Sequence, residues 1–234
     1  NMLPLLLILM LFPLNSQADK GQKNKTLSDT WYVFQTGSTP WGYYHEFIEE
    51  REGQYSYRWE MTKRERNVQY QEFIGALAKT DLTPITFNMS KNGQGAVEII
   101  NGNYKPDGKG GGAFHIEVQG ARTSTLKRIL NKNTIMESFF PLWVNKNRQK
   151  MTAGSKHSVQ IFSEDQSGTN FSTKAARILV KGHDKDCLLL KVSFKDENYD
   201  WCIDKDGIMK EMVVGGKIHV KRVSGEKEAR SYLK

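Results

Sequence analysis

Large apolar side chains occupy every second position in several segments of this chain, and no other feature restricts the possible folds as strongly. In residues 55–62, YSYRWEMT, aromatic and methionine side chains alternate with polar ones. This period of two is typical of a β-strand with one buried face and one solvated face. The pattern recurs in residues 85–90, 114–118, 188–194 and 217–222, with turn-forming residues between the segments. A mainly β protein built from antiparallel strands is therefore predicted.

Two segments depart from the alternation. Residues 125–144, TLKRILNKNTIMESFFPLWV, carry bulky apolar side chains without a period of two. Thr134 and Glu137 have the spacing of a capping box, which predicts a short helix, and Pro141 is expected to end it. Residues 224–234 predict a second short helix.

The start of the chain has the character of an export signal. Residues 1–18 contain no charged side chain, and the apolar run over residues 3–14 is too short to span a bilayer comfortably. Small residues precede a cleavage position after Ala18, so we predict a signal peptide and a mature protein that is soluble in the periplasm. A retained N-terminal anchor is the alternative. Residues 19–30 are polar and predict a flexible leader, and residues 31–234 predict a single curved antiparallel β domain.

The charge balance is basic, with 34 Lys and Arg against 26 Asp and Glu and a net charge of +8. A positive charge favours anionic surfaces such as phospholipid head groups and cell-wall polymers. The densest basic runs are TKRER at residues 62–66 and KIHVKR at residues 217–222. Neither belongs to a module that interleaves basic residues with stacking aromatics, so nucleic acid is not a predicted partner.

Residues 199–212, YDWCIDKDGIMKEM, raise the question of a metal loop. When Gly207 is aligned with the sixth position of a calcium-binding loop, Cys202 and Val213 fall where the first and twelfth oxygen ligands are required. The segment 204–207 instead has Asp at the start of a turn and Gly at the left-handed position. A turn between two strands is therefore predicted, and no metal site.

The chain has two cysteines, Cys187 and Cys202, on either side of a predicted hairpin through residues 195–198. The simplest register puts Cys202 opposite Lys191, which leaves Cys187 four residues away, or roughly 13 Å along the strand. That distance exceeds the roughly 7 Å that a disulfide spans between Cα atoms. An exported protein with two cysteines ordinarily joins them, however, and a shifted register or a bulge would bring them together. The disulfide is a candidate that the sequence leaves open.

Catalytic and metal-binding patterns are absent from the sequence. It lacks the Gly-x-Ser-x-Gly motif of common serine hydrolases, and nothing near the cysteines marks a base or an oxyanion hole. The histidines stand singly, without the spacing that metal ligands require: His45, His115, His157, His183 and His219. The protein is predicted to be non-enzymatic and to need no cofactor.

Six motifs in order resemble a group of exported bacterial proteins of unknown function: TWYVFQTGSTPWGYYHE, TDLTPITF, a Gly-rich hairpin, ESFFPLW, GSKHSVQIF and WCIDKDGIMKEM. The chain also resembles the domain that precedes transglutaminase-like modules in some envelope proteins. The resemblance covers most of residues 31–223. It implies a fold similar to that of lipoprotein carriers, in which a strongly curved antiparallel sheet (a half-barrel) wraps one or two short helices, with residues 125–144 as plug or lid. It brings no catalytic residues.

The aromatic face of residues 55–61 has two interpretations, ordinary core or the wall of a ligand cavity, and a sheet that wraps around itself can provide both. We therefore predict a protein that binds an apolar ligand or a lipid-like envelope component in its half-barrel. The alternative is an interaction subunit that docks on an envelope enzyme or a cell-wall polymer through its basic outer strands. The candidate ligand-binding residues are Tyr55, Tyr57, Trp59, Met61, Phe87, Phe139, Phe140, Trp143 and Trp201.

Overall fold

The computed structural model describes residues 24–233 except for 66–67, 94–95, 165–170 and 185. The predicted signal peptide, residues 1–18, lies outside the described residues. No helix in the described part of the chain is both long enough and apolar enough to cross a membrane.

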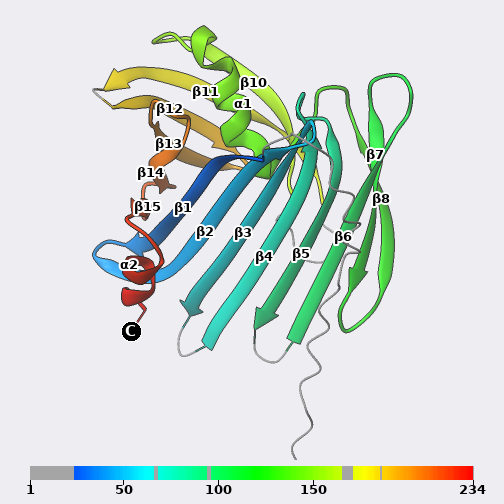
Figure 1. Ribbon diagram of the computed structural model, residues 1–234, viewed down its shortest axis with the longest axis horizontal. Coiled ribbons are helices and arrows are strands. Elements are labelled where there is room, and N and C mark those ends of the chain that lie inside the picture. The colour runs from blue at the N-terminus through cyan, green and yellow to red at the C-terminus, as the bar shows by residue number, and fades with distance from the viewer. Residues whose placement is uncertain (1–23, 66–67, 94–95, 165–170, 185, 234) are drawn as a thin grey trace, which may run out of the picture.

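The described strands form one sheet in the order β8-β7-β6-β5-β4-β3-β2-β1-β15-β14-β13-β12-β11-β10-β9 (Figure 1). All neighbouring strands are antiparallel except β9 and β10. The predicted mainly β fold with a curved, unclosed antiparallel sheet is confirmed. We call β1–β8 the N-terminal arm and β9–β15 the C-terminal arm; they join where β1 pairs with β15.

The strands of the N-terminal arm are β1 (Lys25–Thr36), β2 (Thr39–Arg51), β3 (Gln54–Glu65), β4 (Val68–Lys79), β5 (Pro84–Gly93), β6 (Ala96–Pro106), β7 (Gly112–Gln119) and β8 (Ser124–Leu130). Those of the C-terminal arm are β9 (Ile135–Met136), β10 (Lys156–Phe162), β11 (Thr173–Asp184), β12 (Cys187–Phe194), β13 (Glu197–Ile203), β14 (Met209–Val214) and β15 (Ile218–Val223).

The chain connectivity explains why the sheet is strongly curved. β8 and β9 lie at opposite edges of the sheet, yet only residues 131–134 connect them. Because an extended residue spans about 3.5 Å, so short a connection requires the two edges to approach each other. The Arg128 side chain of β8 closes part of the gap, since its Nε donates a hydrogen bond of 2.9 Å to the carbonyl of Phe171, beyond β10.

An aromatic cluster fills the space between the two arms. Phe162 of β10 lies with its ring centroid 4.6 Å from that of Phe114 on β7 and 5.6 Å from that of Phe87 on β5. Phe171 completes the cluster, with its centroid 6.1 Å from that of Phe162. All four rings are buried. The inward residues of both arms thus share one core.

The polar leader predicted for residues 19–30 is too long, because β1 begins at Lys25. Ser28 and Thr30 lie on the buried face of β1, and their hydroxyl oxygens are 3.1 Å apart, within hydrogen-bonding distance. Polar side chains that satisfy each other in this way can occupy inward positions of a strand. Polarity alone therefore misplaced the start of the sheet.

The helix in the segment 125–144 begins later than predicted. The first residues of the segment 125–144 belong to β8, and the α-helix α1 spans Phe140–Asn147. The predicted capping box is wrong: Phe139 is the residue before α1, and no side chain caps the start of that helix. Pro141 lies in the first turn instead of at the end, where its missing N–H removes no helical hydrogen bond. Two 3₁₀ turns flank α1, η1 (Glu137–Phe139) and η2 (Arg148–Lys150).

The two α-helices lie on different sides of the sheet. α1 lies across the opening between the two arms, above the ends of β1 and β2 (Figure 1). The C-terminal α2 (Glu226–Ser231) buries Ala229 against Val33 and Tyr43 on the convex side of β1 and β2. Only α1 is therefore placed where a plug or lid would lie.

The predicted turn between β13 and β14 is present. The Asp204 carboxylate accepts hydrogen bonds of 3.0 Å from the backbone N–H groups of Asp206 and Ile208. Gly207 has φ of 81°, and a Cβ at this position would lie 2.4 Å from the side chain of Asn145 in α1. The turn therefore needs glycine both for its backbone conformation and for its approach to α1.

Replacing Gly207 with alanine is expected to destabilise the protein by about 1–2 kcal/mol from the left-handed backbone alone, and by more because of the contact with Asn145. Gly53→Ala is the matched control, since Gly53 has φ of 74° but nothing within 4 Å of its added Cβ. Chemical denaturation of both variants measures the difference. An equal loss of stability in the two would contradict the close approach to α1.

Cys187 and Cys202 are joined by a disulfide, with their Cα atoms 5.2 Å apart. The sequence-based register was shifted by two residues: Cys202 lies opposite Leu189, not Lys191. The cause is the turn, which uses two residues, Lys195 and Asp196, both at positive φ, instead of four. The tighter turn moves the cysteines within reach of each other.

Candidate functional site

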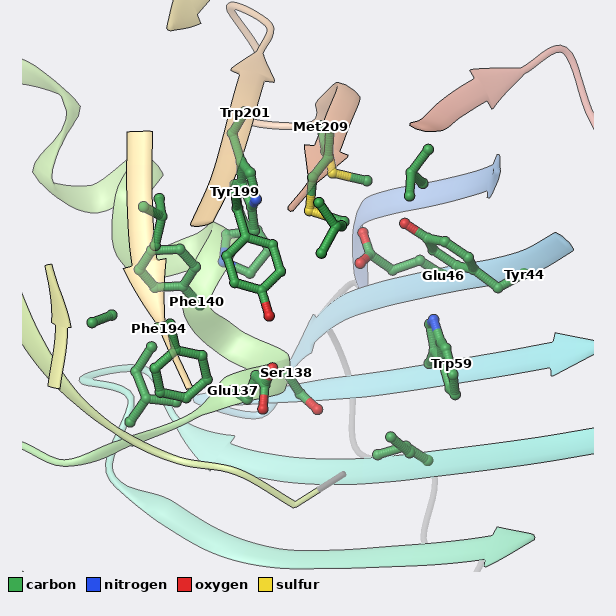
Figure 2. A pocket seen from close by; sticks show the side chains of 18 of the residues that line it. Tyr44, Glu46, Trp59, Glu137, Ser138, Phe140, Phe194, Tyr199, Trp201 and Met209 are labelled. Atoms are coloured by element: carbon green, nitrogen blue, oxygen red, sulfur yellow. The ribbon is translucent and has the colours of Figure 1, made fainter. Parts of the chain in front are cut away.

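A cavity of about 330 Å³ lies between the two arms near their junction. β1 to β4 form one wall, β10 to β15 form the other, and η1 and the start of α1 form one end (Figure 2). Most of the lining is aromatic or aliphatic: Phe34, Tyr44, Tyr57, Trp59, Ile74, Phe140, Pro141, Ile161, Ala176, Val192, Phe194, Tyr199, Trp201, Met209, Met212, Val214, Ile218 and Val220.

Four of the nine candidate ligand-binding residues meet at this cavity: Tyr57, Trp59, Phe140 and Trp201. They come from β3, α1 and β13, which are far apart in the sequence. Trp201 also contacts the ring of Phe140 edge-on at 5.1 Å between centroids. The curved sheet therefore brings aromatic residues of both arms and the helix to one space.

Phe87, Phe139 and Trp143 do not line this cavity. Phe87 belongs to the aromatic cluster, where its ring lies over Gly102; a Cβ on Gly102 would lie 2.0 Å from it. Phe139 is fully buried against Tyr57, with centroids 6.0 Å apart. Trp143 packs behind Phe140, with the two rings stacked at 6.1 Å. These three side chains pack against other core residues. The sequence alone did not distinguish such core positions from positions in a cavity wall.

The remaining two candidates lie at other places. Tyr55 lines a neighbouring cavity of about 420 Å³, together with polar residues of both charges. Met61 packs in a small core cluster with Tyr32, Phe34 and Tyr44. The strand-wide aromatic face of β3 is thus divided between several environments.

A carboxyl group, that of Glu46, projects from β2 into the apolar cavity (Figure 2). Its hydrogen-bond partners are hydroxyl groups: Ser28 Oγ donates at 3.4 Å, and Tyr57 also donates to it. Burial among apolar side chains raises the pKa of Glu46 to about 7, because the charged form loses its hydration. Glu46 also lines the neighbouring polar cavity, so it stands where the two cavities meet.

Two further carboxyl groups hold η1 at the end of the cavity. Glu164, which is 1% exposed, accepts hydrogen bonds from the backbone N–H groups of Glu137 at 2.9 Å and Ser138 at 2.8 Å. Burial and the nearby Glu137 raise the pKa of Glu164 to about 7. Glu137 accepts a hydrogen bond from Ser163 and pairs with Lys195 at 2.8 Å. These two acids therefore have structural partners, whereas Glu46 forms no ion pair with any described residue.

The chemistry of the lining suits binding. Within the part of the chain that the structure describes, no histidine, cysteine, lysine or arginine lines the cavity. Among the described residues, no three His, Cys, Asp or Glu side chains come together in a group that could hold a metal ion. A preformed apolar pocket with a few polar groups is the usual form of a small-molecule site.

Sequence reasoning missed Glu46, Glu137 and Glu164. Glu46 had a usable signal, since it stands between Tyr44 and Ile48 at inward positions of an alternating strand. Glu137 and Glu164 had none, because each lies just outside a strand, where alternation does not apply.

Comparisons with known proteins give the fold only. No family model matches the chain, and no curated protein matches it. Among solved structures, a β-barrel-like protein of the domain of unknown function DUF1849 from Brucella abortus has a TM-score of 0.61 at 11% identity, over 83% of this chain and 94% of that one. A DUF1089 family protein from Pseudomonas aeruginosa has a TM-score of 0.45 at 10% identity, over 75% of this chain and 90% of that one.

The first of these structures shows that this chain has a β-barrel-like fold found in a domain of unknown function. The resemblance to the domain before transglutaminase-like modules is not shown by either structure and stays a prediction. The chain is thus similar in fold to one β-barrel-like domain of unknown function, and its function has to be argued from its own cavity.

Proposed function

We propose that this protein is a non-enzymatic binding protein that holds an apolar or amphiphilic small molecule in the cavity between its two arms. The observation that carries the proposal is the preformed space of about 330 Å³ with an aromatic and aliphatic lining. Ordinary protein interiors are packed to near-crystalline density, so a cavity of this size is uncommon unless it serves a ligand. Consistent with the signal predicted at the start of the chain, we place this activity in the periplasm, where the ligand would be a lipid-like envelope component.

The position of the helix supports the same proposal. Phe140 and Pro141 close one end of the cavity from α1, while Met209 and Met212 line the wall formed by β14. Methionine side chains are flexible and adapt to different apolar shapes. A ligand entering between α1 and the C-terminal arm would find a wall that can adjust to it.

The replacement Val214→Trp tests the proposal. Val214 is half-buried on β14 and lines the cavity, so a larger side chain can occupy the space without displacing a fully buried residue. We expect delipidated wild-type protein to take up a fluorescent fatty amine or phospholipid, and the variant to lose at least about tenfold in affinity, as filling an apolar pocket removes the volume that the ligand needs.

The matched control is Val97→Trp, since Val97 is 53% exposed on β6 and does not line this cavity. Its uptake should equal that of the wild type in the same fluorescence titration. Uptake that Val214→Trp leaves unchanged, or no uptake by the wild type, would refute a ligand site between the arms.

The alternative function, docking on an envelope enzyme or anionic polymer through the basic outer strands, has less support. Lys63, in the first basic run, lies 3.3 Å from Glu65 and 3.2 Å from Glu72. Arg222, in the second, lies 2.6 Å from Asp204. These ion pairs reduce the positive charge that each run offers to a partner.

A further inference from the structure

We propose that the ligand of this cavity is a cationic amphiphile, an alkyl chain with a protonated amine head that pairs with the carboxylate of Glu46. The inference rests on the proposed function, and it names the charge of the molecule that the cavity accepts.

The charges of the lining are the first argument. The protein has a net charge of +8, yet the described residues that line this cavity include three carboxyl groups and no basic side chain. Glu164 and Glu137 are occupied by backbone N–H groups, Ser163 and Lys195. Glu46 is the carboxyl group of the lining whose partners, Ser28 and Tyr57, are neutral hydroxyls. A carboxylate held among apolar side chains without a cation is costly, and an amine from a ligand would supply the missing charge.

The rings around Glu46 are the second argument. Trp59 lies opposite Glu46 on β3, and Tyr44 lies two positions before Glu46 on β2, with the centroids of the two rings 5.7 Å apart (Figure 2). Aromatic faces attract cations, most strongly where water is excluded. A carboxylate beside such rings is the combination that recognises an ammonium group, and it would repel the head group of a fatty acid.

The position of Glu46 is the third argument. It lies at the boundary between the apolar cavity and the neighbouring cavity, which is lined by charged residues of both signs, Lys25, Glu50, Lys146 and Asp206. A head group at Glu46 therefore lies at the polar end, and an alkyl chain extends toward Phe194 in the other direction (Figure 2).

The opposite wall carries an unsatisfied polar atom. Nε1 of Trp201 is buried and has no hydrogen-bond acceptor in the parts of the chain that are described. Buried donors in proteins are almost always paired, so an orphan in a cavity wall indicates a partner supplied by a ligand or by water. A protonated amine has no acceptor to offer, so the partner of Trp201 is water or a further polar group on the bound molecule, whereas Glu46 is the group that the amine itself can satisfy.

Three probes of equal chain length test the inference: decylamine, 1-decanol and decanoic acid, each titrated calorimetrically into delipidated full-length protein near pH 8, below the micelle concentration. An alkylamine is protonated there, since amines of this type titrate near about 10. We expect decylamine to bind about tenfold more tightly than 1-decanol, the gain typical of a hydrogen bond to a charged group, and decanoate to bind most weakly. The net charge of the protein favours decanoate, so preference for the amine must come from the cavity.

Glu46→Gln should abolish the preference for amine over alcohol. Glu49→Gln is the matched control, a carboxylate on the same strand that does not line the cavity, and it should keep the wild-type ratio. Equal binding of amine and alcohol, tightest binding of decanoate, or an amine preference that survives Glu46→Gln would each overturn the inference while leaving the proposed function intact. Failure of all three probes to bind would overturn both.

Discussion

Replacing Phe162 with alanine is expected to lower the free energy of unfolding by about 3–5 kcal/mol, the range for truncating a buried aromatic residue. Phe162 is fully buried and its ring contacts those of Phe87, Phe114 and Phe171. Phe87, Phe114 and Phe162 come from β5, β7 and β10, and Phe171 lies just before β11, so the loss acts on the contact between the arms and not on a single hairpin. For a domain of this length, such a change corresponds to a fall in Tm of roughly 10 °C, measurable by circular dichroism.

Phe47→Ala is the control for this prediction. Phe47 is half-buried on β2, where the guanidinium of Arg58 lies 5.1 Å from the centroid of its ring. Its removal opens no internal cavity, and a cost near 1 kcal/mol is expected. If the two variants lost similar stability, the aromatic cluster would not be the contact that holds the arms together.

Glu46→Gln is expected to make the protein more stable than the wild type at pH 8, and no more stable near pH 4.5. The pKa of Glu46 is raised from 4.5 to about 7 by burial. Below pH 4.5 the group is protonated in both folded and unfolded chains and has no effect. As pH rises from 4.5 to 7 the unfolded chain loses the proton first, so the folded state is progressively destabilised. One pKa unit is worth about 1.4 kcal/mol, so the full penalty above pH 7 is about 3 kcal/mol.

Glutamine cannot ionise and therefore avoids this penalty, while its side-chain oxygen can still accept from Ser28 and Tyr57. Urea unfolding of both proteins between pH 4.5 and 8.5 gives the difference at each pH, in which the titration of all other groups cancels. Glu49→Gln should show no such trend. A difference that stays constant with pH would mean that Glu46 has the same pKa in the folded and unfolded chains.

The alternation of side chains was sufficient to predict the sheet, because each strand has to bury one face. β8 shows where that signal fails. There Arg128 takes an inward position, where its Nε donates to Phe171, and Ile129 is 77% exposed on the other face. The alternating pattern expects an apolar residue at the inward position of Arg128 and a polar residue at the exposed position of Ile129. Residues 124–130 were therefore not recognised as a strand.

The candidate site could be predicted only in part. Trp59 and Phe87 have the same alternating surroundings, but one lines the cavity and the other fills the core. The difference depends on how far the sheet curls and on Gly102, which lets the ring of Phe87 lie on the backbone. Neither is encoded within a single strand. Glu46 was missed for a related reason, since a charged side chain is assigned to solvent unless the space that it faces is known.

The pairing of β1 with β15 has a consequence for how the protein is made. Every other antiparallel pair joins strands that follow each other along the chain, and these hairpins can form as synthesis proceeds. Trp31, in contrast, finds its partner Val223 only after all the strands between β1 and β15 have been made. Until then one side of β1 offers open backbone groups to any extended segment nearby. The edge of β1 therefore stays unpaired until β15 has been made, and a chaperone would be needed longest at β1.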